Sequence, residues 1–241
     1  MTIFNTSSEF TNEVKQLAET EEEIAFIRSI LPMYEKVPQV MDLYCGYGRH
    51  SIELAKQGCI VTAVDNFHDL LSIARQKAQA ASVDISFREC DMRDLDYHNC
   101  FDAVINMFSA FGYYTDDENV RVLKLISKAV KDGGVFLLDL LNRDWIVHNN
   151  LNRYWRDPEG EYVLSYKVEV QNKVVLMRRQ LFKVATNEKI QYDFLLRPYS
   201  LHEMTDMLKQ AGFAIQGIYG GFDKCAYSSE TPHMILLAQK K

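Results

Sequence analysis

Two glycines lie between a predicted strand and a predicted helix. In the segment 41–55, MDLYCGYGRHSIELA, an apolar run ends on Asp42, and Gly46 and Gly48 follow before a helical pattern begins. Glycines at such a junction let a ligand approach the backbone closely, and the first amides of the helix then point toward that ligand. Because two glycines also occur in simple tight turns, this loop predicts a ligand site only together with other residues.

Two aspartates follow the next two predicted strands. Asp65 ends the second strand, 19 residues after Gly46, where a carboxylate can hold both hydroxyls of a ribose. Asp91 follows the third strand in ECDMRDL, where it can accept a hydrogen bond from an exocyclic amine. Each aspartate alone fits a loop carboxylate or a helix cap. All three features lie at the carboxyl ends of successive parallel strands, where such sheets bind ligands, and together they predict a nucleoside site.

The elements that must position these residues alternate between strands and helices. The predicted strands are 37–43, 59–64, 85–88, 101–107 and 135–140, and the predicted helices are 48–57, 70–81 and 118–130. Continuous apolar strands separated by helices predict an α/β fold with a parallel sheet and helices on both faces. A helix over 201–210, capped by Ser200, and two closing strands complete this pattern.

The hydrophobic period changes to two in the middle of the chain. The segments 162–170, 174–184 and 189–197 predict three antiparallel strands joined by short turns. Residues 143–198, which contain them, hold ten Lys and Arg against seven Asp and Glu. Their apolar stripe either packs this insert onto the sheet or roofs a substrate pocket; its members are Tyr162, Tyr166, Tyr192 and Phe194.

An acidic segment precedes the first strand. Thr20 and Glu23 form the pattern of a capping box, and the helix that follows ends before Pro32. We predict three parts: an N-terminal helical lid over 1–36, a core domain over 37–142 and 199–241, and an inserted antiparallel β cap over 143–198. The first helix alternatively docks only for core burial.

Composition excludes several classes of protein. The 241 residues carry a formal net charge of −6, which disfavours a nucleic-acid substrate. The five cysteines form no C-x-x-C pair and the six histidines are scattered, so we expect reduced thiols, no metal and a cytoplasmic location. No apolar stretch is long enough to cross a membrane, and no signal peptide is recognisable.

The glycine loop distinguishes between two nucleoside cofactors. A dinucleotide fingerprint needs a third glycine, and Ser51 occupies its place, which weakens the prediction of a nicotinamide-dependent oxidoreductase. The run from Asp42 to Gly48 instead resembles motif I of the class I S-adenosylmethionine-dependent methyltransferases, D-x-G-x-G-x-G, with Tyr44 in place of the first glycine. The longer D-L-x-C-G-x-G-R-H-S pattern resembles small bacterial methyltransferases of the type 11/25 group. The resemblance extends over roughly residues 20–241.

This resemblance implies a Rossmann-like, mostly parallel seven-stranded sheet, the inserted cap, and S-adenosyl-L-methionine as cofactor. It places Gly46 and Gly48 against the methionine portion, Asp65 on the ribose, and Asp91 with the Met92 amide around adenine. Arg49 either pairs with the cofactor carboxylate or forms a salt bridge. The full set of cofactor-binding residues expected is Asp42, Tyr44, Gly46, Gly48, Arg49, Asp65, Asn66 (or Phe67, facing adenine), Asp91, Met92, and Asn106 with Met107 beside the methionine ammonium.

The acceptor is expected to be a small molecule, methylated by in-line displacement. Tyr113, His148 and Tyr227 are the candidate general bases. The aromatic segment 108–114 either stabilises the sulfonium or packs in the core. Alternatives are an RNA or protein methyltransferase and a non-catalytic nucleoside-binding protein. We expect a monomer or homodimer without a membrane partner.

Overall fold

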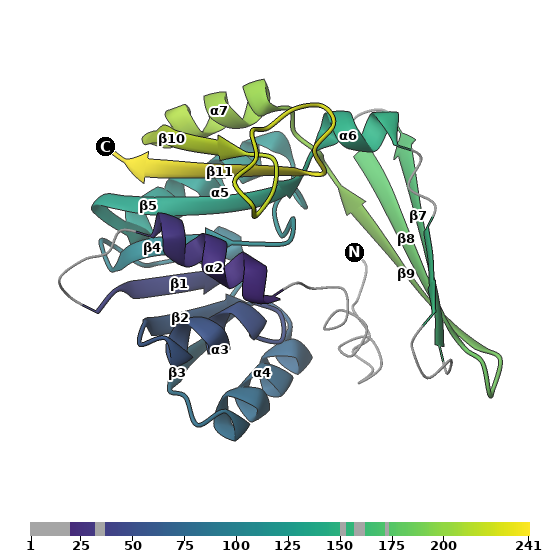
Figure 1. The fold of residues 1–241 in the computed structure, drawn as a ribbon. Helices are drawn as coiled ribbons and strands as arrows, with labels where there is room; N and C mark the ends of the chain where they lie inside the picture. Colours follow the sequence, from purple (N-terminus) through teal and green to yellow (C-terminus); the bar gives the residue numbers. More distant parts are fainter. Residues whose placement is uncertain (1–19, 32–36, 150–152, 157–161, 172–173) are drawn as a thin grey trace.

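The computed structural model describes residues 20–31, 37–149, 153–156, 162–171 and 174–241. Its main sheet has seven strands in the order β10-β11-β5-β4-β1-β2-β3 (Figure 1). These strands are β1 (Gln39–Leu43), β2 (Ile60–Asp65), β3 (Ile85–Glu89), β4 (Phe101–Asn106), β5 (Val130–Leu141), β10 (Phe213–Tyr219) and β11 (His233–Lys240). β1 to β5 pair in parallel, whereas β11 is antiparallel to both β5 and β10. The predicted mostly parallel seven-stranded sheet is confirmed.

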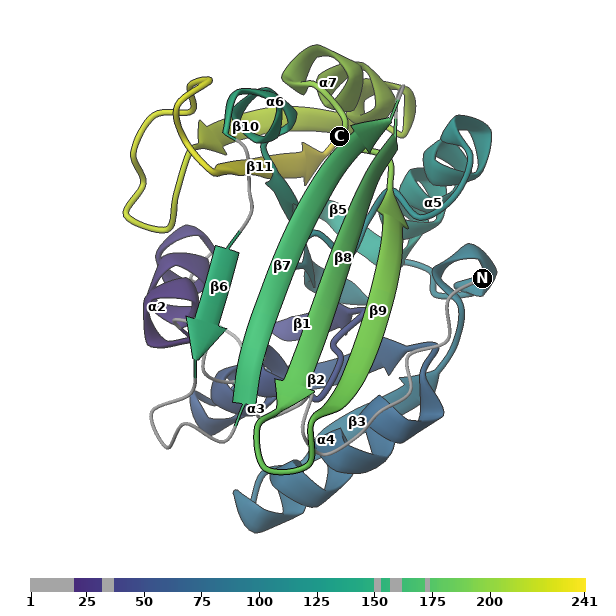
Figure 2. The same cartoon turned by 90° about the vertical axis from the view of Figure 1, so that its right-hand side faces the viewer.

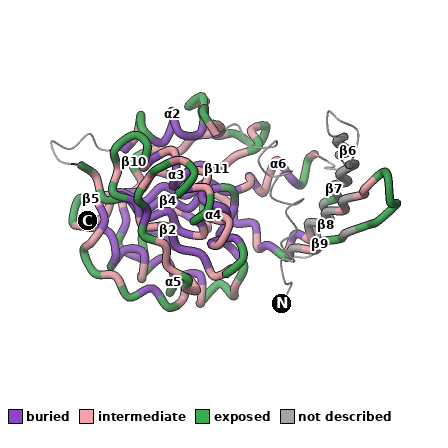
Figure 3. The backbone as a smooth tube through the Cα atoms, turned by 90° about the horizontal axis from the view of Figure 1, so that it is seen from below, coloured by how far each residue is buried: buried purple, intermediate pink, exposed green. Residues whose placement is uncertain are grey.

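Helices cover both faces of this sheet because successive strand side chains point to opposite sides. Met41 packs with α5 (Asp116–Ala129) and α7 (Leu201–Gln210) on one face. Val40 packs on the other face with α2 (Thr20–Ile30), α3 (Arg49–Lys56) and α4 (His68–Ala80). Figure 3 shows the buried backbone concentrated in the sheet and in the inward sides of these helices. The expected helices on both faces are therefore present.

Two of the boundaries that differ from the sequence prediction have a clear structural cause. α5 begins two residues earlier than predicted, because Thr115 and Glu118 form a capping box at its N-terminus. β5 begins at Val130, five residues before the start of the predicted strand 135–140. Val130 already pairs with Phe101 of β4, and a register shift in β4 between Phe101 and Ala103 accommodates the glycines inside β5.

The insert forms a separate antiparallel sheet of four strands, where the sequence predicted three. They are β6 (Arg153–Arg156), β7 (Tyr162–Gln171), β8 (Val174–Lys183) and β9 (Glu188–Leu196), in that spatial order. A short helix, α6 (Arg143–His148), connects β5 to this cap. The cap stands beyond the carboxyl end of β5, and Figure 2 shows it in front of the core. The side chains of the predicted apolar stripe lie outside the described residues: Tyr162, Tyr166, Tyr192 and Phe194.

α2 lies against the core near the glycine loop. Its Phe26 ring makes edge contacts with Tyr219 and Phe222, at centroid distances of 5.3 Å and 5.7 Å. The Glu23 carboxylate, expected beside the first amides of this helix, reaches across to α3 and accepts from Arg49 and His50. Residues 1–19 and 32–36 of the predicted lid lie outside the described part of the chain.

Candidate active site

The two loop glycines serve different purposes. Both have left-handed backbone, with φ of 57° at Gly46 and 79° at Gly48. A Cβ at Gly48 would lie 3.0 Å from the Cβ of Ala74, so this glycine permits close packing of α3 on α4. A Cβ at Gly46 would meet no atom within 4 Å. Gly46 is therefore the position at which a ligand can approach the backbone.

Asp65 is joined directly to this loop. Its Oδ2 accepts from the Gly46 amide at 2.8 Å, and its Oδ1 accepts from the Phe67 amide at 3.0 Å. The side chain is only 3% exposed. Burial raises the pKa of Asp65 to about 6, although the backbone hydrogen bonds oppose that rise. The structure thus brings the end of β2 and the glycine loop together, as their positions in the sequence predicted.

Asp91 lies in a second cluster that includes Tyr44. Its carboxylate accepts from the Arg93 guanidinium at 2.9 Å and from the Tyr114 hydroxyl at 3.1 Å. The Tyr114 and Tyr44 hydroxyls are 2.7 Å apart. Partial burial opposes ionisation of Asp91, but the hydrogen bonds from Arg93 outweigh it and lower the pKa of the carboxyl.

The cluster explains why a tyrosine replaces the first motif glycine. Tyr44 has a φ of 60°, a left-handed conformation that costs a non-glycine residue free energy. In this conformation its side chain reaches from the end of β1 toward Asp91 through Tyr114. The sequence did not predict the contact of Tyr114 with Asp91, because the spacing between the two residues follows no helix or strand period. The Met92 side chain beside Asp91 is fully buried.

Asp42 and Ser51 form a buried pair beneath the loop. The Ser51 hydroxyl donates to Asp42 Oδ2 at 2.6 Å, and both residues are at most 1% exposed. Burial is the main reason that the pKa of Asp42 is raised. Ser51 therefore uses the place of the third dinucleotide glycine for a helix–strand hydrogen bond. Asp42 thereby joins the end of β1 to the helix that follows the loop.

Arg49 takes the salt-bridge alternative and keeps one donor unpaired. Its Nη1 donates to Glu23 and, at 3.2 Å, to Thr20, both on α2. Burial opposes ionisation of Glu23, but His50 and Arg49 outweigh it and lower its pKa to about 2. The guanidinium lies 5.5 Å from the centre of the Phe108 ring. Its Nη2 is buried without a hydrogen-bond partner among the described residues.

Asn106 and Asn66 also carry buried acceptors. The Asn106 Nδ2 donates to the carbonyl oxygens of Leu43 and Ala110, so it joins the ends of β1 and β4. The Oδ1 atoms of Asn106 and Asn66 have no hydrogen-bond partner within the described part of the chain. Met107 is 4% exposed. Unpaired buried acceptors are costly, and they fit a ligand that brings hydroxyl or ammonium donors.

The three candidate bases lie in different surroundings. The Tyr113 ring is 40% exposed and stacks on Tyr44 at 6.4 Å between centroids. The Tyr227 hydroxyl donates to Asn142 Oδ1 at 3.1 Å. His148 is exposed at the end of α6, and its Nδ1 lies 2.6 Å from the Asp144 carbonyl oxygen. Of these three residues, Tyr113 is the one whose ring stacks on a predicted cofactor residue, Tyr44.

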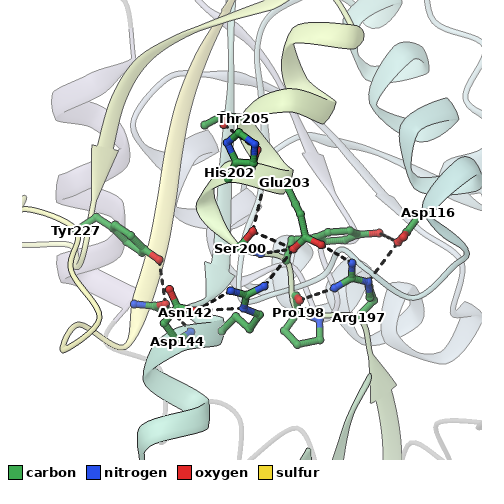
Figure 4. A network of polar contacts seen from close by, with 12 residues as sticks. Asp116, Asn142, Asp144, Arg197, Pro198, Ser200, His202, Glu203, Thr205 and Tyr227 are labelled. Carbon is green, nitrogen blue, oxygen red and sulfur yellow. Dashed lines mark hydrogen bonds and ion pairs between the residues drawn. The ribbon is translucent and has the colours of Figure 1, made fainter. Parts of the chain in front are cut away.

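A polar network joins the cap to the core near these residues (Figure 4). Glu203 on α7 accepts from Arg197, which follows β9, at 2.6 Å, and from Arg143 of α6 at 3.3 Å. One carboxylate thus binds the entry and the exit of the insert. The Arg197 amide also donates to the Gly112 carbonyl at 2.9 Å. The exit of the cap is therefore attached to the segment 108–114 of the candidate site.

The described residues offer neither a metal centre nor a membrane span. No group of three or more His, Cys, Asp or Glu side chains there is arranged to hold a metal ion. No described helix is long and apolar enough to span a membrane.

Known proteins match both the sequence and the fold. A family of methyltransferase domains matches residues 40–134. A protein of Geobacillus sp. (strain WCH70), named as a methyltransferase without a stated acceptor, is 26% identical over 224 residues, which are 90% of this chain and 91% of that protein. An S-adenosylmethionine-dependent methyltransferase from Clostridium acetobutylicum has a TM-score of 0.83 at 19% identity and covers 94% of both chains.

A third match is a structure that contains the cofactor. S-adenosylmethionine-bound CalS10, an amino pentose methyltransferase from Micromonospora echinaspora, has a TM-score of 0.78 at 18% identity and covers all of both chains. The family match makes residues 40–134 a methyltransferase domain, and the solved structures show that the chain has the fold of class I S-adenosylmethionine-dependent methyltransferases. The nicotinamide alternative finds no support.

Proposed function

We propose that this enzyme transfers the methyl group of S-adenosylmethionine to a small-molecule acceptor. The observation that carries the proposal is the contact of Asp65 with the open Gly46 position, because it gives one place both a close-approach backbone and a buried carboxylate. The net charge of −6 and the amino-sugar acceptor in the name of CalS10 favour a small molecule over RNA.

The residues around Gly46 fit the parts of this cofactor. Asp65 would accept from the ribose hydroxyls, and Asp91 with the Met92 amide would bracket the adenine. The unpaired Asn106 Oδ1 offers an acceptor to the methionine ammonium, and the unpaired Arg49 Nη2 offers a donor to its carboxylate. Asn66 also has a free acceptor for the nucleoside.

The bound cofactor supplies an electrophilic methyl group on a sulfonium. The protein contributes orientation of the acceptor in line with that methyl group and exclusion of water. The exposed rings of Phe108 and Tyr113 offer aromatic faces near the glycine loop, which favour a cationic centre. We assign Tyr113 as the first base to test, because it stacks on Tyr44. His148 and Tyr227 are secondary candidates.

Two measurements test the proposal. Isothermal titration with S-adenosylhomocysteine is expected to show binding to the folded protein, and absence of heat would contradict the cofactor site. Transfer of labelled methyl groups is then measured with a panel of small amines, phenols and thiols, with bulk tRNA and a protein mixture beside it. Labelling confined to a small molecule supports the proposal, whereas labelling confined to tRNA or protein refutes the acceptor class.

A further inference from the structure

The segment after β4 contains a turn of unusual backbone geometry. Phe108 and Ser109 are consecutive non-glycine residues in left-handed conformation, with φ values of 60° and 58°. Such conformations persist only where surrounding contacts impose them, and they occur preferentially at functional sites. This turn carries the exposed Phe108 ring over Arg49, next to the glycine loop.

Asp139 of β5 supplies the contacts that impose this turn. Its Oδ2 accepts from the Phe108 amide at 2.9 Å, and its carbonyl oxygen accepts from the Ser109 amide at 3.0 Å. The Ser109 hydroxyl in turn accepts from the Leu141 amide at 2.7 Å. Asp139 is 1% exposed, so its carboxylate is fixed beneath the turn.

The other oxygen of Asp139 pairs with a histidine on the neighbouring strand β11. His233 Nδ1 lies 2.9 Å from Asp139 Oδ1. The pair spans two adjacent strands, since β11 lies beside β5 and His233 is opposite Leu141. The Phe222 ring covers the imidazole at 4.9 Å between centroids.

We propose that Asp139 and His233 are positioning residues, which hold the Phe108–Ser109 turn against the cofactor site. Asp139 binds the turn directly, and His233 acts through Asp139 by fixing and neutralising its carboxylate. The inference rests on the proposed function, because the turn continues from Asn106 and Met107, the backbone assigned to the methionine ammonium.

The charges around His233 favour its protonated form. Asp139 faces it from β5, and Glu22 and Glu23 act on it from α2. Burial opposes protonation, but the hydrogen bond and charge of Asp139 outweigh it, so the pKa of His233 is raised above its ordinary value. Its support of the turn is therefore complete at low pH and decreases as pH rises through that raised pKa.

The test compares wild type with His233→Arg and His233→Gln in titrations with S-adenosylhomocysteine. Between about pH 6 and about pH 8.5 the wild-type affinity is expected to fall about three- to tenfold relative to His233→Arg, which keeps its charge. Relative to His233→Arg at the same pH, His233→Gln is expected to bind at both pH values as weakly as wild type does at the higher one. Titration of Asp65 affects all three proteins equally and cancels in the ratio.

Circular dichroism and urea unfolding establish that each variant is folded. A second variant, Ser109→Ala, removes the acceptor for the Leu141 amide and is expected to weaken binding without changing the pH dependence. Equal pH dependence in wild type and His233→Arg would overturn the inference while leaving the proposed function intact. Absence of binding by wild type at every pH would instead refute the cofactor site itself.

Discussion

Asp65→Asn is the substitution that most directly separates the proposed site from a structural turn. In the wild type, both carboxylate oxygens accept from backbone amides, one from Gly46 and one from Phe67. An asparagine keeps a single acceptor, so its NH₂ group must face one of these N–H donors. The variant therefore loses one charge-assisted hydrogen bond within the loop and the negative charge offered to the ribose.

The size of the effect on affinity follows from the charge-assisted hydrogen bond that Asp65 would accept from the ribose and that the variant weakens. A hydrogen bond to a charged group contributes roughly 1.5–3 kcal/mol, which corresponds to an affinity loss of about 10- to 100-fold for S-adenosylhomocysteine. The assay is isothermal titration calorimetry at neutral pH. The matched control is Asp84→Asn, which removes the same charge from an exposed position before β3. Its affinity is expected to equal that of wild type.

The pH dependence of the S-adenosylhomocysteine affinity is a second test of Asp65. Because burial raises the pKa of Asp65 to about 6, the carboxyl of the free protein is partly protonated near that pH. Ribose hydroxyls that donate to it favour the ionised form, so affinity is expected to rise between about pH 5 and about pH 7. Asp65→Asn should lose this rise. Unchanged affinity together with an unchanged pH profile would show that Asp65 does not bind the ribose.

Three other substitutions test the surrounding contacts. Gly48→Ala is expected to destabilise the protein by about 1–3 kcal/mol in urea unfolding, because the residue is left-handed and its Cβ would crowd Ala74; equal stability would contradict this packing. Tyr114→Phe removes the hydroxyl between Tyr44 and Asp91 and should weaken S-adenosylhomocysteine binding by about 2- to 10-fold, and tighter binding would be inconsistent with the cluster. Glu203→Gln should lower the unfolding free energy by about 1–3 kcal/mol, and no change would show that the two arginines do not depend on its charge.

The sequence predicted the core because the core repeats local patterns. Apolar runs between amphipathic helices were enough to place β1 to β4 within a few residues and to predict helices on both faces. β5 was predicted to begin too late, since Gly133 and Gly134 read as a turn. Its first residues are held by pairing with β4, which is a long-range contact that no local window contains.

The cap was predicted only in part for the same reason. Period-two alternation identified β7, β8 and β9, whereas β6 has four residues and is too short to show a period. The α6 helix has six residues and begins at the Asn142 cap, whose side chain accepts from the Asp144 amide. Such short elements are defined by their contacts more than by their composition.

Of the contacts in the candidate site, some were predicted from the sequence and others were not. Gly46 and Asp65 were predicted together, because each follows a strand and parallel strands place their carboxyl ends side by side. The partners of Arg49 and Asp91 were not predicted from the sequence. Glu23 and Tyr114 reach them from elements 26 and 23 residues away, and only the folded chain brings these side chains into contact.

A crystal structure with S-adenosylhomocysteine bound would show directly whether the glycine loop and Asp65 hold the cofactor. We expect the ribose hydroxyls to lie within hydrogen-bonding distance of the Asp65 carboxylate, the adenine beside Asp91, and the amino-acid portion over Gly46. A ligand bound elsewhere, with Gly46 and Asp65 untouched, would contradict the assignment of this loop as the cofactor site.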